Sequence, residues 1–146
     1  MDYRKYGDTF YIRLDRGDEI ITGILDVCQR ESLVSCTYSG IGGCGRAEIQ
    51  SFIPATGSFE TRVIEGMLEL VSLTGNVVSD REGRRYHHTH AVLAYKDGEE
   101  HRVAAGHIRS IHVSYTAEIT LKPVAGGELR RREDPETGTG FWDFES

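Results

Sequence analysis

Apolar and polar residues alternate along most of this chain, and the alternation starts near residue 32. A period of two places successive side chains on opposite faces, as in a half-buried β-strand. Turn-forming Gly, Asn and Asp residues separate the alternating runs. One further alternating run, residues 9–14, lies before residue 32. The pattern predicts strands over residues 9–14, 33–38, 47–52, 58–64, 67–78, 86–95, 102–109 and 111–123.

Between the first two of these strands the period changes to that of a helix. The apolar residues at helical spacing are Ile20, Ile21, Ile24, Leu25 and Cys28. Asp18 is a favourable N-cap, so we predict a helix from Glu19 to about Glu31. One long helix among many strands predicts an α+β fold with a mainly antiparallel sheet. The dipeptide Asp97-Gly98 predicts a tight hairpin.

The last predicted strand has the most regular alternation. One face carries Val113, Tyr115, Ala117, Ile119 and Leu121, and the other carries His112, Ser114, Thr116, Glu118 and Thr120. A strand with one polar face borders water, a subunit interface or a functional cavity. Glu118 is therefore a candidate catalytic general base beside a metal-bound water, or an ion-pair partner of Arg109 or another arginine.

Length and composition restrict the class of protein. A chain of 146 residues forms one domain, and its net charge of −6 argues against autonomous DNA binding, which normally uses a basic patch. No apolar run reaches the roughly 18 residues needed to span a bilayer, and the first residues have no apolar signal region. We therefore expect a cytoplasmic protein. Cys28, Cys36 and Cys44 form no Cys-x-x-Cys pair, so we expect reduced, buried thiols.

All six histidines lie between residues 87 and 112. His88 and His90 share one face of a strand, and His107 on a neighbouring strand completes a set of three. Three neutral imidazoles hold zinc or another divalent metal and leave one position open. The alternative is a group of exposed or hydrogen-bonded strand histidines. His87 points away from His88 and His112 lies further along the chain, so both are weaker candidates.

A glycine-rich segment, Gly40-Ile-Gly42-Gly43-Cys-Gly45, fits the G-x-G-x-x-G pattern of dinucleotide sites. That fingerprint requires a helix after the last glycine, but residues 47–53 alternate and Pro54 ends them. We expect no nucleotide cofactor. Gly40, Gly42 and Gly43 instead predict a tight connection with positive φ or a close backbone approach, which can serve a ligand or a symmetry axis. Gly75, inside an apolar strand, predicts a β-bulge.

Several short motifs occur together in a specific order. They are Arg16-Gly-Asp-Glu19, Ser39-Gly-Ile-Gly-Gly43, Leu68-Glu-Leu-Val-Ser-Leu-Thr-Gly-Asn-Val77, His88-Thr-His90, Ala105-Gly-His107 and Thr116-Ala-Glu-Ile119. This succession resembles the plants and prokaryotes conserved (PPC) domain over about residues 7–125, and we assign residues 1–125 to a PPC-like domain. The resemblance implies a mainly antiparallel α+β fold that assembles as a homotrimer. It also implies a metal at His88, His90 and His107, as in some members of the family.

The resemblance leaves three functional interpretations. The first is a trimeric, metal-containing binding or interaction module with a small-molecule or protein partner and no membrane contact. The second is a metal-dependent enzyme that uses the open position, with Glu118 or His112 transferring protons. The third is a DNA-associated regulator, although the Arg-Gly-Arg-Pro core of an AT-hook is absent. This third interpretation requires a patch of arginines gathered by trimerisation, for which the candidates are Arg84, Arg85, Arg102 and Arg109.

The segment 126–146 is charged and contains glycine, yet it ends with Phe141, Trp142 and Phe144. Three aromatic residues are unusual in a free tail. We expect this segment to dock on the domain or on a neighbouring subunit.

Overall fold

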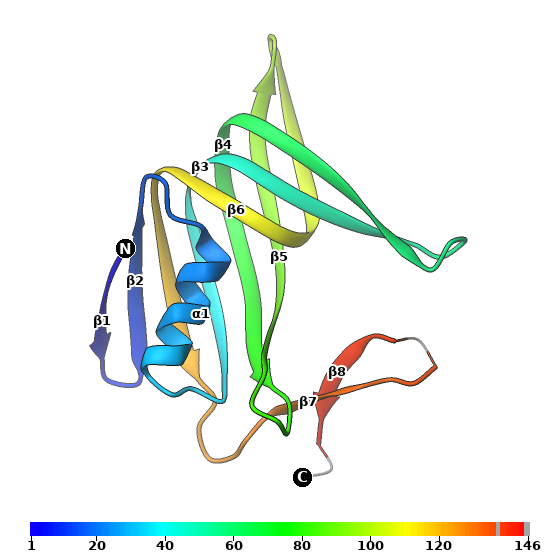
Figure 1. Ribbon diagram of the computed structural model, residues 1–146. Helices are drawn as coiled ribbons and strands as arrows, with labels where there is room; N and C mark the ends of the chain where they lie inside the picture. The colour runs from blue at the N-terminus through cyan, green and yellow to red at the C-terminus, as the bar shows by residue number, and fades with distance from the viewer. Residues whose placement is uncertain (137, 145–146) are drawn as a thin grey trace.

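The computed structural model describes residues 1–136 and 138–144, which form an eight-stranded, mainly antiparallel sheet with one helix packed against it (Figure 1). The fold class predicted from the sequence is confirmed at this level. The elements are β1 (Asp2–Tyr6), β2 (Thr9–Asp15), α1 (Ile20–Arg30), β3 (Ser35–Ile53), β4 (Ser58–Ser79), β5 (Arg85–Asp97), β6 (Glu100–Pro123), β7 (Arg130–Glu133) and β8 (Gly140–Asp143).

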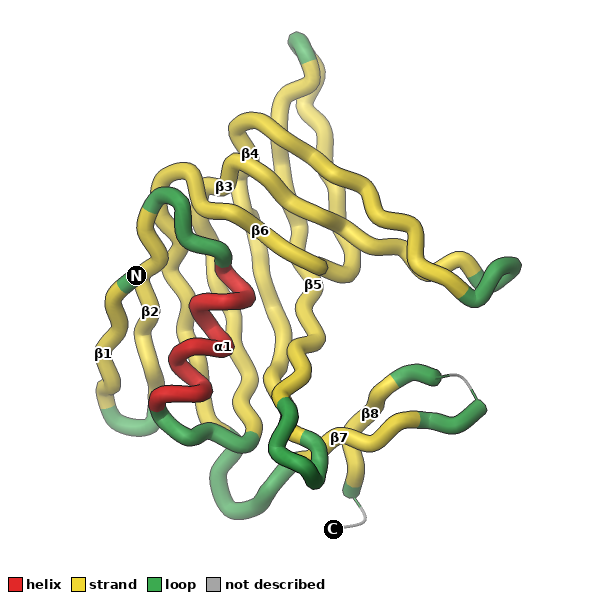
Figure 2. Tube along the Cα trace, in the orientation of Figure 1, coloured by secondary structure: helices red, strands yellow, loops and turns green. Residues whose placement is uncertain are grey.

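Strand β6 belongs to two parts of the sheet. Its C-terminal half pairs with β2 and with the first half of β3, whereas its N-terminal half pairs with β5 and with the second half of β3. The long strands bend between these two parts, and β3 and β4 continue as a hairpin that extends away from the helix (Figure 2). As a result, β3 contacts both halves of β6.

Three pairs of predicted strands are single long strands in the structure. Residues 33–38 and 47–52 fall in β3, 58–64 and 67–78 in β4, and 102–109 and 111–123 in β6. The predicted connection at Gly40, Gly42 and Gly43 was wrong, because these glycines lie inside β3 and have no positive φ. The close backbone approach is present: a Cβ on Gly42 would lie 2.6 Å from the carbonyl oxygen of Thr116.

The predicted bulge at Gly75 was also wrong. Gly75 pairs in register with Tyr38 and with Thr89. The irregularities of these two ladders lie elsewhere, between Gly40 and Gly42, between Cys44 and Arg46, and between Leu70 and Ser72. A Cβ on Gly75 would lie 2.6 Å from the ring of Tyr38. The glycine therefore makes room for a neighbouring side chain rather than for an extra residue.

The helix begins one residue later than predicted. Glu19, rather than Asp18, is the N-cap, and its carboxylate accepts hydrogen bonds from the backbone N–H groups of Ile21 (3.1 Å) and Thr22 (2.7 Å). The same carboxylate accepts from the N–H of Ile111 at 3.0 Å, which ties the helix to β6. Asp18 is engaged in the preceding turn, where it accepts from the N–H of Asp15.

The hydrophobic core lies between α1 and one face of the sheet. The buried apolar side chains of the helix are Ile20, Ile21, Ile24, Val27 and Cys28. All of them except Ile21 form one core cluster with buried residues of β2, β3 and β6. The three cysteines are free and buried, as predicted. The opposite face of the sheet carries no helix in the described part of the chain, and its polar side chains are exposed.

The regular alternation predicted for the last strand fails at Tyr115. Val113, Ala117, Ile119 and Leu121 are buried, but Tyr115 is 69% exposed. Gly42 pairs with Ala117 and Cys44 with Val113, so Tyr115 and its two neighbours face the single residue Gly43. This irregularity turns the tyrosine outward.

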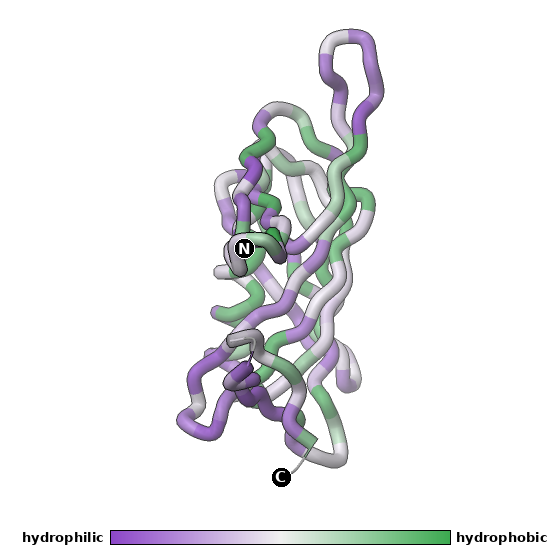
Figure 3. Tube along the Cα trace, turned by 90° about the vertical axis from the view of Figure 1, so that its right-hand side faces the viewer, coloured by the Kyte–Doolittle hydropathy of each residue, from purple (hydrophilic) through white to green (hydrophobic). Residues whose placement is uncertain are grey.

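The two hairpins at the ends of the molecule differ in character. The β5–β6 hairpin turns at Gly98, which has a φ of +61°, as Asp97-Gly98 predicts; it forms a hydrophilic projection (Figure 3). The β7–β8 hairpin meets β4 through the parallel pair Ser79 and Arg130.

Of the segment 126–146, residues 137, 145 and 146 lie outside the described residues. No helix in the described ranges is long and apolar enough to cross a membrane.

Candidate metal centre

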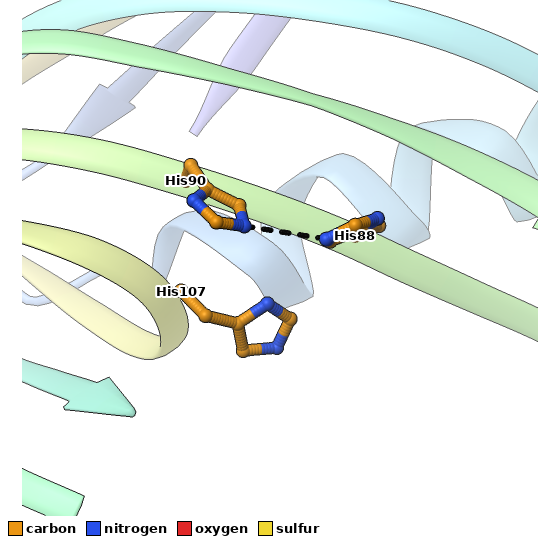
Figure 4. A group of neighbouring side chains, drawn as sticks. All are labelled: His88, His90 and His107. Carbon is orange, nitrogen blue, oxygen red and sulfur yellow. Dashed lines mark hydrogen bonds between the residues drawn. The ribbon is translucent and has the colours of Figure 1, made fainter. Parts of the chain in front are cut away.

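Three histidines from two neighbouring strands point toward one another (Figure 4). His88 and His90 lie on the same face of β5, and His107 of β6 is the direct partner of His90 in the ladder. One nitrogen from each ring lies within 4.8 Å of the others. The structure thus brings together the three residues that the sequence pattern selected.

The spacing of the first two rings is close to that of metal ligands. The Nε2 atoms of His88 and His90 are 3.3 Å apart. Two nitrogens bound at about 2.0–2.1 Å to a tetrahedral zinc ion are roughly 3.3–3.4 Å apart. The ring centroids of all three histidines are separated by 5.2–5.5 Å.

Burial favours the neutral form of two of these imidazoles, those of His88 and His107, and neutral imidazole is the form that binds metals. Partial burial, with a smaller contribution from the neighbouring histidines His88 and His90, lowers the pKa of His107 to about 4. Burial also lowers the pKa of His88. Neutral imidazole carries the lone pair that a metal requires, so His88 and His107 need not lose a proton at neutral pH.

The residue between the two ligand candidates anchors β5 from the other side. Thr89 is fully buried, and its hydroxyl hydrogen-bonds to the Tyr38 hydroxyl at 2.5 Å and to Nδ1 of His87 at 2.9 Å. Burial lowers the pKa of His87, which faces away from the three histidines. The alternation of the strand thus separates a buried hydrogen-bonded side from the exposed histidine side.

Two glycines let the neighbouring strands come close to this site. A Cβ on Gly75 of β4 would lie 2.5 Å from the carbonyl oxygen of His88. Gly106, next to His107, has a φ of +156°, and a Cβ there would lie 2.9 Å from Cγ2 of Ile49. Both glycines therefore influence the position of the histidines through the backbone that carries them.

The structure does not bring the other candidates to the histidines. Glu118 lies on the exposed face opposite Arg13 and Ile41, in a separate depression that none of the three histidines lines. His101 is exposed on β6 near the β5–β6 turn, and His112 forms a backbone bridge with Glu19. Arg109, considered as a partner for Glu118, instead pairs with Glu48 at 3.6 Å.

A cleft of about 1190 Å³ opens outward from the three histidines. One wall is the end of the β3–β4 hairpin with Phe52 and Phe59, and the other is the C-terminal hairpin with Phe141 and Trp142. The ring of Phe59 is 6.0 Å from that of His107. Phe52 and Phe59 were not predicted as site residues from the sequence, because only the bending of β3 and β4 brings them near the histidines.

The C-terminal hairpin contacts the sheet through specific polar groups. Arg130 donates a hydrogen bond to the carbonyl oxygen of Asp80 at 2.9 Å, and the guanidinium of Arg131 stacks 4.1 Å from the ring of Tyr86. Asp143 is buried and lies 3.4 Å from a guanidinium nitrogen of Arg81. These contacts hold Trp142 beside the histidine cleft.

The sequence matches the Plants and Prokaryotes Conserved (PCC) domain over residues 1–125. The match covers most of the chain, so the protein belongs to this family and the resemblance found in the sequence motifs is confirmed. No curated protein is significantly similar to this chain.

Solved structures of similar fold cover nearly the whole chain. A protein from Bacteroides thetaiotaomicron, provisionally named as a DNA-binding protein, is 24% identical over 99% of this chain and 98% of its own, with a TM-score of 0.90. The plant- and prokaryote-conserved (PPC) protein of Pyrococcus horikoshii is 28% identical over 97% and 94%, with a TM-score of 0.81. The metal-containing protein AF0104 of Archaeoglobus fulgidus is 27% identical over 97% and 98%, with a TM-score of 0.80.

The packing around Gly75 leads to a first prediction. Gly75→Ala should lower the free energy of unfolding by about 1–3 kcal/mol, because the new methyl group must displace Tyr38 or the backbone of β5. Chemical denaturation followed by circular dichroism measures the loss. Gly127→Ala is the control, since a Cβ at Gly127 meets nothing within 4 Å. Equal stability of the two variants would contradict this packing role.

Proposed function

We propose that this protein is a homotrimeric, metal-containing binding module in which His88, His90 and His107 hold one divalent ion, zinc or a similar metal. The observation that carries the proposal is the 3.3 Å separation of the His88 and His90 nitrogens with a third imidazole facing them. The metal-containing protein of Archaeoglobus fulgidus, with the same fold, supports it. The free, buried cysteines support the expected cytoplasmic location, because thiols stay reduced there.

The ion would act as a Lewis acid that binds an oxygen ligand at its open position. The three histidines fix its place on the sheet, and the buried side of β5 holds their backbone. Glu118 and His112 lie away from this position, so the residues expected to transfer protons in an enzyme are not beside it. This arrangement favours ligand binding over hydrolysis.

The chain's own surface supports assembly with further copies. The strand pairing is irregular at neighbouring positions of β3, β4 and β6. Each irregularity exposes an apolar side chain: Ile41 is 57% exposed, Val71 54% and Tyr115 69%. Bulges that turn apolar residues outward beside one another create a patch that contact with another subunit would cover. We propose that this patch lies at the interface of the trimer.

The family's DNA-binding designation has less support in this chain. Arg84 pairs with Asp80, Arg102 with Glu100 and Arg109 with Glu48, and each of these acids reduces the local positive charge. Arg85 is hydrogen-bonded to the carbonyl oxygen of Leu33 and to Gln29. The net charge of −6 adds a general repulsion toward phosphates. Trimerisation would have to gather these arginines despite their local partners.

Metal analysis tests the proposed site. Untagged native protein should contain about one divalent ion per chain, and His90→Ala should weaken metal affinity by more than about tenfold, because one of three ligands is lost. Elemental analysis after equilibrium dialysis measures both. The exposed His101→Ala variant should keep its metal. A native protein free of metal after dialysis against zinc would refute the site.

The assembly is tested by light scattering. The native protein should have about three times the 16.3 kDa mass of the chain, whereas Tyr115→Asp should shift the equilibrium toward smaller species by charging the apolar patch. The control Tyr6→Asp changes an exposed tyrosine on β1 instead. A native monomer at micromolar concentration would overturn the trimer.

A further inference from the structure

The cleft beside the histidines has walls of a definite chemical kind. Several aromatic rings line it, and four of them are each at least 44% exposed: those of Phe52, Phe59, Trp142 and Phe144. Phe52 and Phe59 contact edge to face at 5.3 Å, and Trp142 and Phe144 do so at 6.2 Å. Large aromatic surfaces left open around a polar centre are typical of a site that a flat apolar group fills.

The charged residues that line the cleft differ from those of the chain as a whole. No Asp or Glu is among its described lining residues, which include Arg131 and Arg132, although the chain carries a net charge of −6. The mostly buried Arg131 guanidinium lies over the ring of Tyr86 and forms an ion pair with the exposed Glu133 at 3.2 Å, which offsets part of its charge. Neutral histidines leave the double positive charge of a bound divalent ion uncompensated. An anionic group is therefore the favoured ligand at the base of the cleft.

The aromatic wall and the metal position are adjacent. The ring of Phe59 is 6.0 Å from that of His107, and Trp142 lines both the large cleft and a second depression of about 620 Å³ that contains His88 and His90. A single small molecule can therefore contact the ion at one end and the rings at the other. The cleft is slightly larger than the roughly 300–1,000 Å³ of ordinary ligand sites.

We propose that this cleft binds an arylalkyl carboxylate, a molecule with a short alkyl chain between ring and carboxylate, whose carboxylate oxygen occupies the open position of the histidine-bound ion and whose ring packs between Phe59 and Trp142. This inference rests on the proposed metal site. It adds the chemical class of the ligand and assigns Phe52, Phe59 and Trp142 to its recognition. The carboxylate supplies the hard oxygen that a divalent ion accepts, and the ring covers aromatic surface that is otherwise exposed.

Trp142 makes the test direct, because it is the one tryptophan of the chain. The probe is 3-phenylpropionate, titrated into zinc-loaded protein and followed by tryptophan fluorescence; its alcohol, 3-phenylpropan-1-ol, is the control for the charge. The carboxylate should bind at least about tenfold more tightly than the alcohol, a difference of about 1.4 kcal/mol. Removal of zinc with a chelator should abolish that preference.

Variants separate the aromatic wall from the metal. Phe59→Ala should weaken binding of 3-phenylpropionate about fivefold or more while the zinc content stays unchanged, because the ring and not the ligand set is lost. Tyr6→Ala removes an exposed aromatic ring on β1 and should change neither quantity.

Cobalt substitution distinguishes failure of the proposed ligand from failure of the proposed metal site. In cobalt-loaded protein the visible d–d absorption should change when 3-phenylpropionate binds, as expected for a ligand entering the open position. A protein that binds cobalt at the histidines but shows no change in absorption or fluorescence refutes the arylalkyl carboxylate ligand and leaves the metal site standing. A protein that binds neither zinc nor cobalt refutes the metal site itself.

Discussion

The antiparallel pairing of β5 with β6 is the constraint on which the candidate site depends. It places His107 directly opposite His90, and the alternation of β5 adds His88 on the same face. Because the ladder fixes the register, a shift of one residue would turn His88 and His90 to the buried side and Thr89 to the surface. The hydrogen bonds of Thr89 with Tyr38 and His87 oppose that shift, since a buried hydroxyl without partners would be costly.

The double role of β6 connects this site to the rest of the molecule. The strand leaves β5 at His107, stays paired with β3, bends at Tyr115 and continues to the core beneath α1. Close backbone approach at Gly42 permits the bend, and the residues displaced by it form the exposed apolar patch. Metal site, proposed subunit interface and core therefore share one strand, so assembly and ligand binding can influence one another through its geometry.

Local sequence patterns predicted much of the fold and the histidines of the candidate site. Apolar periodicity located the helix and most strand residues, and the i, i+2 spacing selected His88 and His90. It could not predict that Gly40, Gly42 and Gly43 continue a strand, because glycine permits both a turn and an extended backbone. Glu19 replaced Asp18 as the N-cap because Ile111, distant in sequence, supplies a third donor to its carboxylate. The aromatic wall at Phe59 depends on strand bending, which no local pattern records.

X-ray absorption spectroscopy at the zinc edge of the purified, zinc-loaded protein tests the central claim most directly. A site formed by His88, His90 and His107 predicts nitrogen or oxygen neighbours at about 2.0–2.1 Å with the outer-shell pattern of three imidazole rings. Loss of one imidazole from that pattern in His90→Ala would identify the ligand. Sulfur neighbours at about 2.3 Å, or a zinc spectrum that is unchanged in His90→Ala, would contradict the account.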